Sequence, residues 1–220
     1  MNSLLKASNL SKSYILENQT IDVLKDISLT IQAAEFVAIM GKSGSGKSTL
    51  ISILAGLDTT DVGQVFLDDK ELTGLTEDEL AEIRQTDISF VFQSFHLIPT
   101  LTVAENIGFP LKLSGNFSDE KVNALLQKVE LSHRKNSFPH QLSGGEKQRT
   151  AIARALITQP KILFADEPTG NLDEKNAKSI MRLLIDLQQE FKTALVVVTH
   201  DDSIAQLADR TIRLINGKIA

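Results

Sequence analysis

The sequence predicts an α/β fold with a parallel sheet covered by helices on both faces. Short apolar runs alternate with segments of helical periodicity: Phe36 to Met40 precedes Lys47 to Ala55, and Lys161 to Ala165 precedes Glu174 to Gln189. Strands buried on both faces are continuously apolar, whereas helices repeat about every 3.6 residues. A glycine-rich turn also joins the first of these strands to its helix. Together these observations predict strands that alternate with helices.

The other expected strands rest on alternation and on turn residues. Asp68-Asp69 marks a turn after one strand, and Asn216-Gly217 marks a hairpin near the end of the sequence, because this dipeptide favours the tight turns between paired strands. The expected strands are, in chain order, Leu4 to Leu10, Ile27 to Ile31, Phe36 to Met40, Gly63 to Leu67, Ile88 to Phe92, Lys161 to Ala165, Leu195 to Thr199 and the hairpin over Thr211 to Ile219.

Residues 102–133 differ in character and predict a small helical subdomain inserted into the α/β core. An amphipathic helix is marked by apolar residues at helical spacing, namely Leu125, Leu126, Val129 and Leu131. Ser118 precedes it as a cap, followed by an acidic first turn. Further along, Ser143 is expected to cap a helix that runs to about Ile157.

Composition excludes several classes of protein. The chain has 220 residues and a formal net charge of −5, which argues against a role in coating nucleic acid. Without cysteine it can form neither disulfides nor thiolate metal sites. The first residues lack the basic start and apolar core of a signal peptide, and no apolar run approaches the ~18 residues of a membrane span. We therefore expect a cytoplasmic protein that reaches a membrane only through a partner.

A phosphate-binding loop follows the strand Phe36 to Met40. Its residues are Gly41, Lys42, Ser43, Gly44, Ser45, Gly46, Lys47 and Ser48, which have the Walker A spacing. The backbone N–H groups of such a loop point inward, and the following helix adds positive potential. We expect Lys47 to reach the β- and γ-phosphates of a nucleotide, Ser48 to bind Mg²⁺ and Thr49 to assist at the α-phosphate. A chance Gly/Ser loop is the alternative, and the strand before it and the helix after it argue against that alternative.

Two carboxylates end the apolar run Ile162 to Ala165. Asp166 falls at the carboxyl end of a strand, where ligands of α/β sheets lie, and in phosphate-loop enzymes such an Asp holds Mg²⁺ through water. We expect Glu167 to act as general base or to orient water for hydrolysis of the γ-phosphate. The alternative for Glu167 is a solvated loop charge. Pro168 stiffens the exit from the strand, which suits a group that needs fixed geometry.

A second glycine turn, Ser143-Gly144-Gly145, precedes a helical run. A capped helix start needs the serine but not two glycines. Two glycines allow close approach to an anion, yet one chain has one phosphate loop and one such turn. A head-to-tail dimer with two-fold symmetry accounts for both, because each turn then faces the γ-phosphate bound by the partner.

These motifs, in this order, make the chain resemble the ATP-binding subunit of ABC transporters along essentially its whole length. Leu142 to Gln148 is similar to the signature motif of that family, and Asn171-Leu172-Asp173 to its D-loop. Gln93 falls at the Q-loop, Tyr14 at the aromatic residue that stacks on adenine, and His200 at the switch histidine that senses the γ-phosphate. Each position alone is also compatible with packing or with a solvated side chain, and the ordered set is what carries the resemblance.

The resemblance implies a P-loop NTPase (RecA-like) core with an antiparallel β subdomain and an inserted α-helical subdomain at about 95–157, all within one ATP-binding domain over 1–220. It implies an ATPase with ATP and Mg²⁺ as cofactors. The implied catalytic residues are Lys47, Glu167 and His200, and the implied Mg²⁺ ligands are Ser48, Gln93 and Asp166. The implied nucleotide-binding residues are Tyr14, Gly41, Lys42, Ser43, Gly44, Ser45, Gly46, Lys47, Ser48, Thr49, Gln93, Ser143, Gly144, Gly145 and Asp173.

Within the family, the loop sequences resemble those of the group that contains LolD, MacB and YbbA. The segments on which this resemblance rests are Ile53 to Asp58, Phe90 to Leu101 and Asp166 to Asp173. The resemblance implies a homodimer on the cytoplasmic face of the inner membrane. It also implies a separate FtsX-like permease, contacted near Gln93 to Leu101 and driven by mechanotransmission for lipoprotein release, export or efflux.

Two alternatives stay open beside this interpretation. One is the ATPase of a non-transporting membrane signalling complex of the FtsEX type. The other is a soluble ABC protein that acts on the ribosome or on DNA, although such proteins usually carry two ATP-binding units or a long coiled-coil insertion. The cargo, whether lipoprotein, peptide or macrolide, is not specified by this chain.

Overall fold

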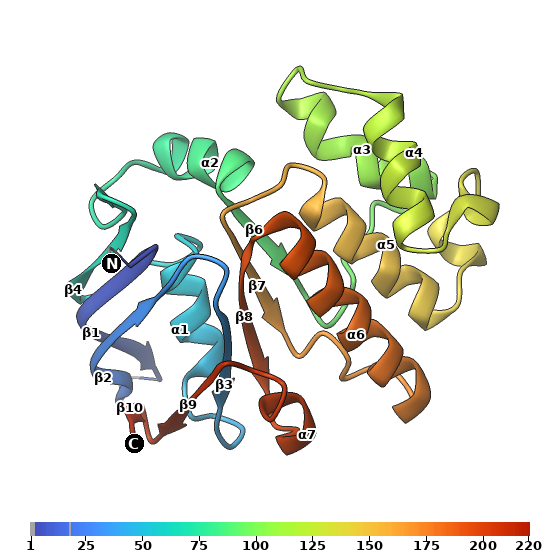
Figure 1. Ribbon diagram of the computed structural model, residues 1–220. Helices are drawn as coiled ribbons and strands as arrows, with labels where there is room; N and C mark the ends of the chain where they lie inside the picture. The colour runs from blue at the N-terminus through green and yellow to red at the C-terminus, as the bar shows by residue number, and fades with distance from the viewer. Residues whose placement is uncertain (1–2, 18) are drawn as a thin grey trace. The chain divides into compact units, whose positions relative to one another are not determined.

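The chain forms two compact units in the computed structural model, which describes residues 3–17 and 19–220 (Figure 1). The first unit combines the residues up to Arg84 with Ala194–Ala220, and the second is Gln85–Thr193. Within the described ranges, none of the helices combines the length and apolar character needed to cross a membrane. The expected mixed α/β class is confirmed, since both units contain strands and helices.

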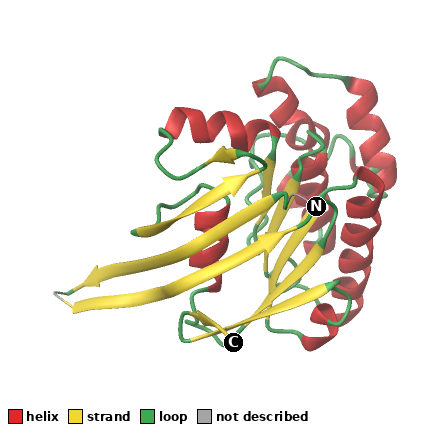
Figure 2. Cartoon of the chain, turned by 60° about the vertical axis from the view of Figure 1, so that its left-hand side comes forward, coloured by secondary structure: helices red, strands yellow, loops and turns green. Residues whose placement is uncertain are grey.

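The first unit contains an antiparallel sheet with the strand order β2-β1-β4-β5. Its strands are β1 (Leu5–Leu16), β2 (Gln19–Ile31), β4 (Val62–Leu67) and β5 (Lys70–Glu71). Figure 2 shows β1 and β2 running side by side as a long hairpin. The sequence predicted only Leu4 to Leu10 and Ile27 to Ile31. Left-handed backbone at Asn9 and Asp26, with irregular pairing around them, breaks the alternation by which a strand is recognised.

The first unit also contains four strands around β3 (Phe36–Met40). β3 pairs in parallel with β8 (Ala194–Thr199) on one side and β9 (Arg210–Ile215) on the other. β9 turns back through Asn216-Gly217 into β10 (Lys218–Ile219), and both turn residues have positive φ, as the predicted hairpin requires. Every residue of β3 and β8 is buried, which explains why both strands are continuously apolar in sequence.

Two helices of the first unit flank these strands. α1 (Lys47–Leu54) follows β3 and lies near the antiparallel sheet, whereas α7 (Asp202–Ala205) packs on β3 and β8 (Figure 1). A further helix, α2 (Glu77–Thr86), leads along the chain from the first unit to the second and was not predicted. Only Leu80 and Ile83 of α2 are buried, so its apolar periodicity is weak.

The second unit contains a parallel strand pair and four longer helices. The strands are β6 (Ile88–Val91) and β7 (Ile162–Asp166). The helices are α3 (Val103–Leu113), α4 (Asp119–Lys128), α5 (Gly144–Leu156) and α6 (Glu174–Phe191), with short 3₁₀ turns at Ser132–Arg134 and Pro139–Gln141. α5 contacts α3, α6 and β6, so it forms the centre of this unit (Figure 1). The boundaries expected for a helical subdomain, 95–157, stay a prediction.

Helix starts in the second unit follow capping rules. Thr102 and Ser143 form capping boxes with the Glu three residues later, and Ser118 accepts a hydrogen bond from the Lys121 N–H. The predicted caps at Ser118 and Ser143 are therefore confirmed. Asp173 caps α6 in the same way.

Candidate active site

The phosphate-binding loop joins β3 to α1 and is shaped by glycine and by Lys47. Gly46 precedes α1 with φ 98°, in the left-handed region, and a Cβ there would lie 2.8 Å from the Val23 carbonyl oxygen. Lys47, 8% exposed, donates from Nζ to the carbonyl oxygens of Gly41 and Lys42 at 2.9 and 3.0 Å. The hydrogen bonds from Lys47 therefore hold the loop in its curved conformation. The first turn of α1 contains no acidic residue that would compete with a bound anion.

One buried hydroxyl in this loop lacks a partner. Ser45 is 6% exposed, and within the part of the chain that the structure describes its Oγ has no hydrogen bond. A Cβ at Gly41 would collide with Ser45 Oγ and with the Leu214 carbonyl oxygen, so the backbone at 41 lies against both atoms. A buried hydroxyl without a partner is costly, and a phosphate oxygen in the loop would satisfy it.

A hollow of about 630 Å³ opens beside the loop within the first unit. It is lined by residues 40–45 of the loop, by His200 and Asp202 after β8, and by residues 213–216 of β9 and its turn. β3 and β8 are neighbouring parallel strands, so their carboxyl ends meet at one edge of the sheet. The structure thus brings His200 to the phosphate loop, although the two lie far apart in the sequence. From the sequence, they could be assigned to one site only through the family resemblance.

The residues of β9 and its turn that line this hollow were not predicted as site residues. Arg213 and Asn216 line it, and Arg213 Nη2 lies 3.9 Å from the Asp202 carboxylate. β9 reaches the loop only because it pairs with β3, which lies far from it in the chain. A basic residue on an exposed strand position gives no local signal of that pairing.

In the second unit, Gln93 lies beside Asn171. Gln93 follows β6, while Asn171 belongs to the loop after β7. Asn171 Nδ2 donates to the Gln93 carbonyl oxygen at 3.0 Å, and Gln93 Nε2 donates to Asn171 Oδ1 at 3.3 Å. The segment expected to be the Q-loop is therefore joined to the segment expected to be the D-loop by two amide contacts.

Glu167 directly follows β7 and has an unusual backbone conformation. Its φ is 44°, in the left-handed region that residues other than glycine rarely adopt. Such strain is retained where surrounding structure demands it, often at functional sites. A Cβ at Gly170 would lie 2.8 Å from Gln93 Nε2 and 3.3 Å from Glu167 Oε2, so both side chains pack against the same glycine. Gln93 and Glu167 thus lie close together, and Asp166 directly precedes Glu167.

The second glycine turn lies against the loop before α6 and the first turn of that helix. A Cβ at Gly144 would lie 3.3 Å from Leu172 Cδ2, and one at Gly145 would lie 3.4 Å from Asn176 Oδ1. An added Cβ would therefore be tight against Leu172 at position 144, which the sequence did not reveal, whereas at position 145 it would make only an ordinary van der Waals contact. Their approach to a γ-phosphate held by a partner stays a prediction.

Asp173 also has a local role. Its Oδ1 accepts a hydrogen bond from the Asn176 N–H at 3.0 Å and its Oδ2 accepts one from Asn176 Nδ2 at 2.5 Å. These bonds lower the pKa of Asp173, so the residue stays ionised as the N-cap of α6. The carboxylate expected in the D-loop is thereby fixed in position by contacts within the chain.

The residues expected to hold Mg²⁺ carry suitable ligand atoms. Ser48 offers a hydroxyl in the first turn of α1, Gln93 an amide oxygen, and Asp166 a carboxylate at the end of β7. Mg²⁺ prefers oxygen ligands and takes only one or two carboxylates, with water and substrate phosphates completing its shell. This set of donors fits the ion.

The turn that begins α5 is stabilised by a charged contact. Arg134 Nε donates to Glu146 Oε1 at 2.8 Å, and Ser143 donates from its N–H and its Oγ to Glu146 Oε2, both at 2.8 Å. Burial acts to raise the pKa of Glu146, but the bonds from Ser143 and Arg134 and the charge of Arg134 outweigh it and lower the pKa from 4.5 to about 2.

We expect Arg134→Ala to destabilise the protein in a pH-dependent manner. Because the folded pKa of Glu146 is depressed, its stabilising contribution is complete above pH 4.5 and is lost as the pH falls through about 2. The variant should lose roughly 0.5–1 kcal/mol of unfolding free energy at neutral pH, a modest value because Arg134 is partly exposed. Urea unfolding at a series of pH values, with Lys121→Ala as the control for an exposed cation, measures the difference. A loss that stays constant as Glu146 protonates would contradict the assignment.

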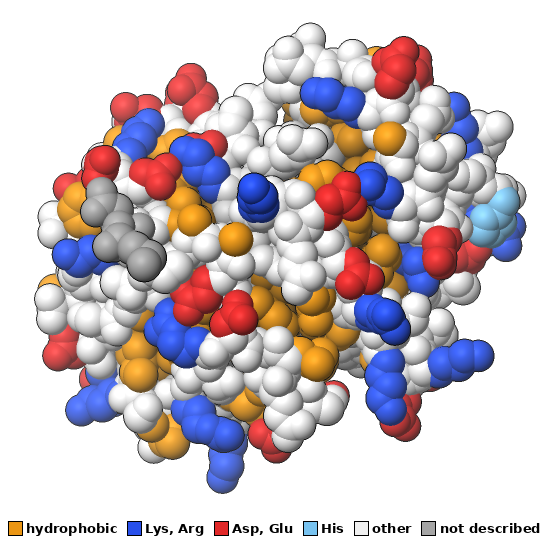
Figure 3. Space-filling view, in the orientation of Figure 1, with side chains coloured by type: hydrophobic (Ala, Val, Ile, Leu, Met, Phe, Trp, Pro, Cys, Tyr) orange, Lys and Arg blue, Asp and Glu red, His pale blue; other side chains and the backbone are white. Residues whose placement is uncertain are grey.

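Charges of both signs are mixed on the face that Figure 3 shows. Among the described residues on that face, Lys and Arg side chains are interspersed with Asp and Glu side chains. Proteins that bind nucleic acid gather their basic residues in a stripe or patch. The visible pattern instead agrees with the modest negative net charge of the chain.

Comparison with known proteins adds three findings. The model of the family described as ABC transporter matches residues 24–170. The chain is 46% identical over 218 residues to the lipoprotein-releasing system ATP-binding protein LolD of Idiomarina loihiensis, with 98% of this chain and 96% of that protein covered. It is 47% identical over 218 residues to the macrolide export ATP-binding/permease protein MacB of Chlorobaculum tepidum, with 98% of this chain but only 33% of that protein covered.

Among solved structures, the fold matches a dimeric ATP-binding cassette in a post-hydrolysis state, bound to ADP and Pi. The TM-score is 0.90 and the identity 43%, with 98% of this chain and 96% of that chain covered. The likeness therefore extends over both units of the chain and concerns the sequence as well as the fold.

Proposed function

Since this chain belongs to the ABC transporter family and is an ABC-type ATPase, we propose that it drives a separate FtsX-like permease from the cytoplasmic face of the inner membrane. ATP-driven closure of a homodimer would be transmitted to the permease and would support lipoprotein release, export or efflux. The relatives named for lipoprotein release and macrolide export support this branch of the family. The observation that carries the ATP site is the hollow shared by the phosphate loop and His200.

The chemistry is transfer of the γ-phosphoryl group to water. The loop from Gly41 to Thr49 would cradle the phosphates, with Lys47 on the β- and γ-phosphates and the buried Ser45 hydroxyl as an additional donor. Glu167 would take a proton from the attacking water, and His200 would contact the γ-phosphate. In such reactions positioning and charge stabilisation contribute most of the rate enhancement. Ser48, Gln93 and Asp166 would hold Mg²⁺, which neutralises charge that develops on the phosphates.

The placement of the signature turn supports a dimer. Ser143, Gly144 and Gly145 begin α5 in the second unit, and we assign them to the ATP bound by the partner chain. The start of a helix with glycine in its first turn suits an anion. The solved cassette with ADP and Pi is dimeric, which supports this assignment. Asp173, fixed as the cap of α6, would couple the two ATP sites.

Recovery of the membrane partner tests the proposal. Tagged Glu167→Gln protein would be incubated with ATP in detergent-solubilised native membranes, recovered, and analysed by mass spectrometry. We expect an integral membrane permease with a large periplasmic domain to co-purify. Recovery of ribosomal or DNA-bound proteins alone would overturn the transporter assignment and leave the ATPase intact. Recovery of a permease together with cell-wall enzymes would favour the non-transporting signalling alternative.

The segment after Gln93 is our candidate for the permease contact. Phe95 and His96 both have left-handed backbone, with φ 59° and 46°. Arg154 of α5 donates to their carbonyl oxygens at 3.0 and 2.7 Å, and the buried Asn106 of α3 donates to and accepts from the backbone of Ile98. Side chains from two helices of the second unit therefore fix the path of this segment while Phe95 itself stays only half-buried.

We expect Phe95→Ala to lose the permease while it retains ATP. The backbone contacts of Arg154 do not depend on the Phe95 side chain, so the segment keeps its path and loses only apolar contact area. The measurement is the yield of permease in the recovery experiment beside ATP affinity of the same protein, with Leu113→Ala, an exposed apolar residue of the same unit, as the control. A Phe95→Ala protein that unfolds would show that the side chain serves packing instead.

A further inference from the structure

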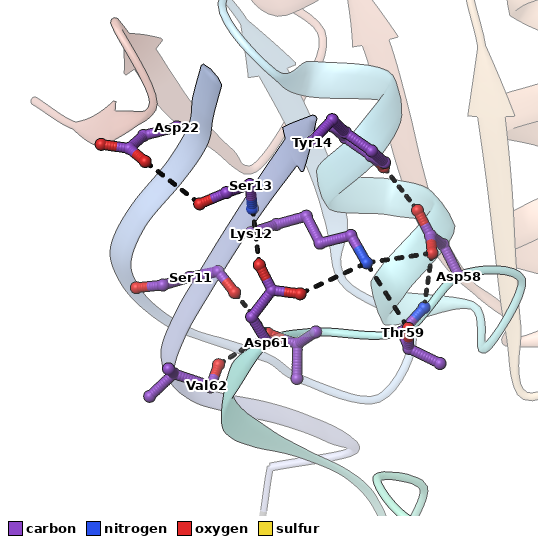
Figure 4. Close-up of polar contacts among 10 residues, drawn as sticks. Ser11, Lys12, Ser13, Tyr14, Asp22, Asp58, Thr59, Asp61 and Val62 are labelled. Atoms are coloured by element: carbon purple, nitrogen blue, oxygen red, sulfur yellow. Dashed lines mark hydrogen bonds and ion pairs between the residues drawn. The ribbon is translucent and has the colours of Figure 1, made fainter. Parts of the chain in front are cut away.

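A polar network connects Tyr14 to the turn that follows α1, as Figure 4 shows. Tyr14 lies on β1 with 37% of its surface exposed, and its hydroxyl donates to Asp58 Oδ2 at 2.5 Å. The two residues are 44 positions apart in the sequence. The phenol is therefore held at its polar end while part of the ring stays accessible.

Asp58 is itself held by two neighbours. Its Oδ1 accepts a hydrogen bond from the Thr59 N–H at 2.7 Å and lies 3.4 Å from Lys12 Nζ. Lys12 is 8% exposed, an unusual burial for lysine, and its second carboxylate contact is Asp61 at 3.6 Å. Figure 4 shows Lys12 Nζ between the two carboxylates. Breaking the Lys12–Asp58 contact would leave a buried charge poorly compensated, so the arrangement resists rearrangement.

Lys12 also lies near the ring of Tyr14 itself. Its Nζ is 5.3 Å from the ring centroid, within the range of a cation–π contact. Asp61 Oδ2 accepts from the Ser13 N–H at 2.7 Å, which ties the same turn to the β1 backbone next to Tyr14. The ring is thus positioned by one contact at its hydroxyl and one over its face, both from charged side chains.

α1 connects the phosphate loop to the turn that contains Asp58. α1 starts at Lys47 in the phosphate loop and ends at Leu54, and Asp58 lies in the turn that follows. The element that would bind the phosphates is therefore continuous with the element that holds the aromatic ring. A ring fixed before the ligand arrives loses less conformational freedom when a base stacks on it.

We propose that Asp58, held by Lys12, is a positioning residue that fixes the Tyr14 ring as the stacking platform for the base of ATP. This inference rests on the proposed function, since it presupposes that the phosphate loop binds a nucleoside triphosphate. It assigns to Asp58 and Lys12 a role in base affinity and none in phosphate binding or in the chemical step. Ligands that have the phosphates but lack the base should therefore be unaffected by changes at Asp58.

The chain permits a direct readout because Tyr14 is its only tyrosine and it has no tryptophan. Burial and the bond to Asp58 raise the pKa of Tyr14 above its ordinary value of 10.0, against an opposing bond with Thr49. Absorbance titration of the phenol therefore reports this one residue. Asp58→Ala should lower its pKa towards 10.0, and quenching of the tyrosine emission by ATP should weaken in the same variant.

The experiment compares dissociation constants for ATP and for inorganic tripolyphosphate. Asp58→Ala should weaken ATP binding roughly 3- to 10-fold, the worth of a well-placed aromatic stack, and leave tripolyphosphate unchanged. Tyr14→Phe, which removes only the hydroxyl, should match it, and the double variant should be no weaker than either single one. Asp58→Asn, which keeps an acceptor oxygen, should restore most of the affinity. Asp78→Ala is the control, because Asp78 is an acidic residue in the first turn of α2 and takes no part in this network.

Three results would overturn the proposal. These are unchanged ATP affinity in Asp58→Ala, an equal loss for ATP and tripolyphosphate, and independent, additive effects of Asp58→Ala and Tyr14→Phe. If Asp58→Ala fails to fold, Tyr14→Phe alone decides, because it disturbs no charge. Failure of the proposed function would look different: the wild-type chain would show no saturable binding of ATP or tripolyphosphate, while the tyrosine titration would still report the contact with Asp58.

Discussion

Replacing Lys47 by alanine should abolish ATP binding or nearly so. Lys47 Nζ is buried in the loop and donates to the carbonyl oxygens of Gly41 and Lys42, so one side chain supplies both the positive charge and a clamp on the loop. Removing it takes away a charge-assisted bond to the phosphates and frees the curvature that presents the backbone N–H groups. We expect ATP affinity and turnover to fall by about 100-fold or more.

The control for this variant is Lys6→Ala, which removes an exposed lysine from β1 of the same unit. Equilibrium binding of ATP and the rate of phosphate release would be measured for both proteins, with thermal unfolding to show that the fold is retained. Hydrolysis at the normal rate in Lys47→Ala would remove the phosphate loop from the ATP site, and with it the role that we assign to the hollow beside His200.

Glu167→Gln should separate binding from turnover. The substitution keeps the shape of the side chain and its place against Gly170 but removes the carboxylate that would accept a proton from water. We expect ATP to bind as in the wild type and turnover to fall by about 100-fold or more. Because closure of the dimer would then not be followed by hydrolysis, the ATP-bound dimer should accumulate.

Light scattering after size exclusion in the presence of ATP would detect that dimer, and phosphate release would measure turnover. Glu190→Gln is a suitable control, since Glu190 lies near the other end of α6 in an exposed ion pair with Lys128. A monomer with ATP bound would count against the head-to-tail arrangement. Wild-type turnover in Glu167→Gln would instead assign the proton acceptor elsewhere while leaving the binding site intact.

The parts of the fold that could be predicted are those with a local cause. β3, β7 and β8 are buried on both faces and are therefore continuously apolar, apart from Asp166 at the end of β7 and Thr199 at the end of β8. α2 was missed because only two of its side chains are buried, although Thr76 and Glu79 form the reciprocal bonds of a capping box that the sequence did contain. The sequence therefore contained a signal for the start of α2, but the helix itself was too weakly amphipathic to be predicted.

The candidate site residues also divide into those with a local sequence signal and those without one. The positions of Lys47 in the loop after β3 and of Glu167 directly after β7 could be predicted, because each belongs to a short motif with its own physical reason. Asp58 and Arg154 could not, because their partners are Tyr14 and the backbone after Gln93, and only the folded chain brings these together. One clue was available for Lys12: it stands on β1 at a position where an apolar residue would be expected, and a buried lysine there needs a carboxylate partner.

Gly170 touches both Gln93 and Glu167, so a single added methyl group would crowd two functional side chains at once. In genetic terms, an allele encoding Gly170→Ala should behave as a loss of function in a protein of normal abundance, because the loop is partly exposed and no core packing is removed. The activity of this site would therefore depend on the absence of a Cβ atom at position 170.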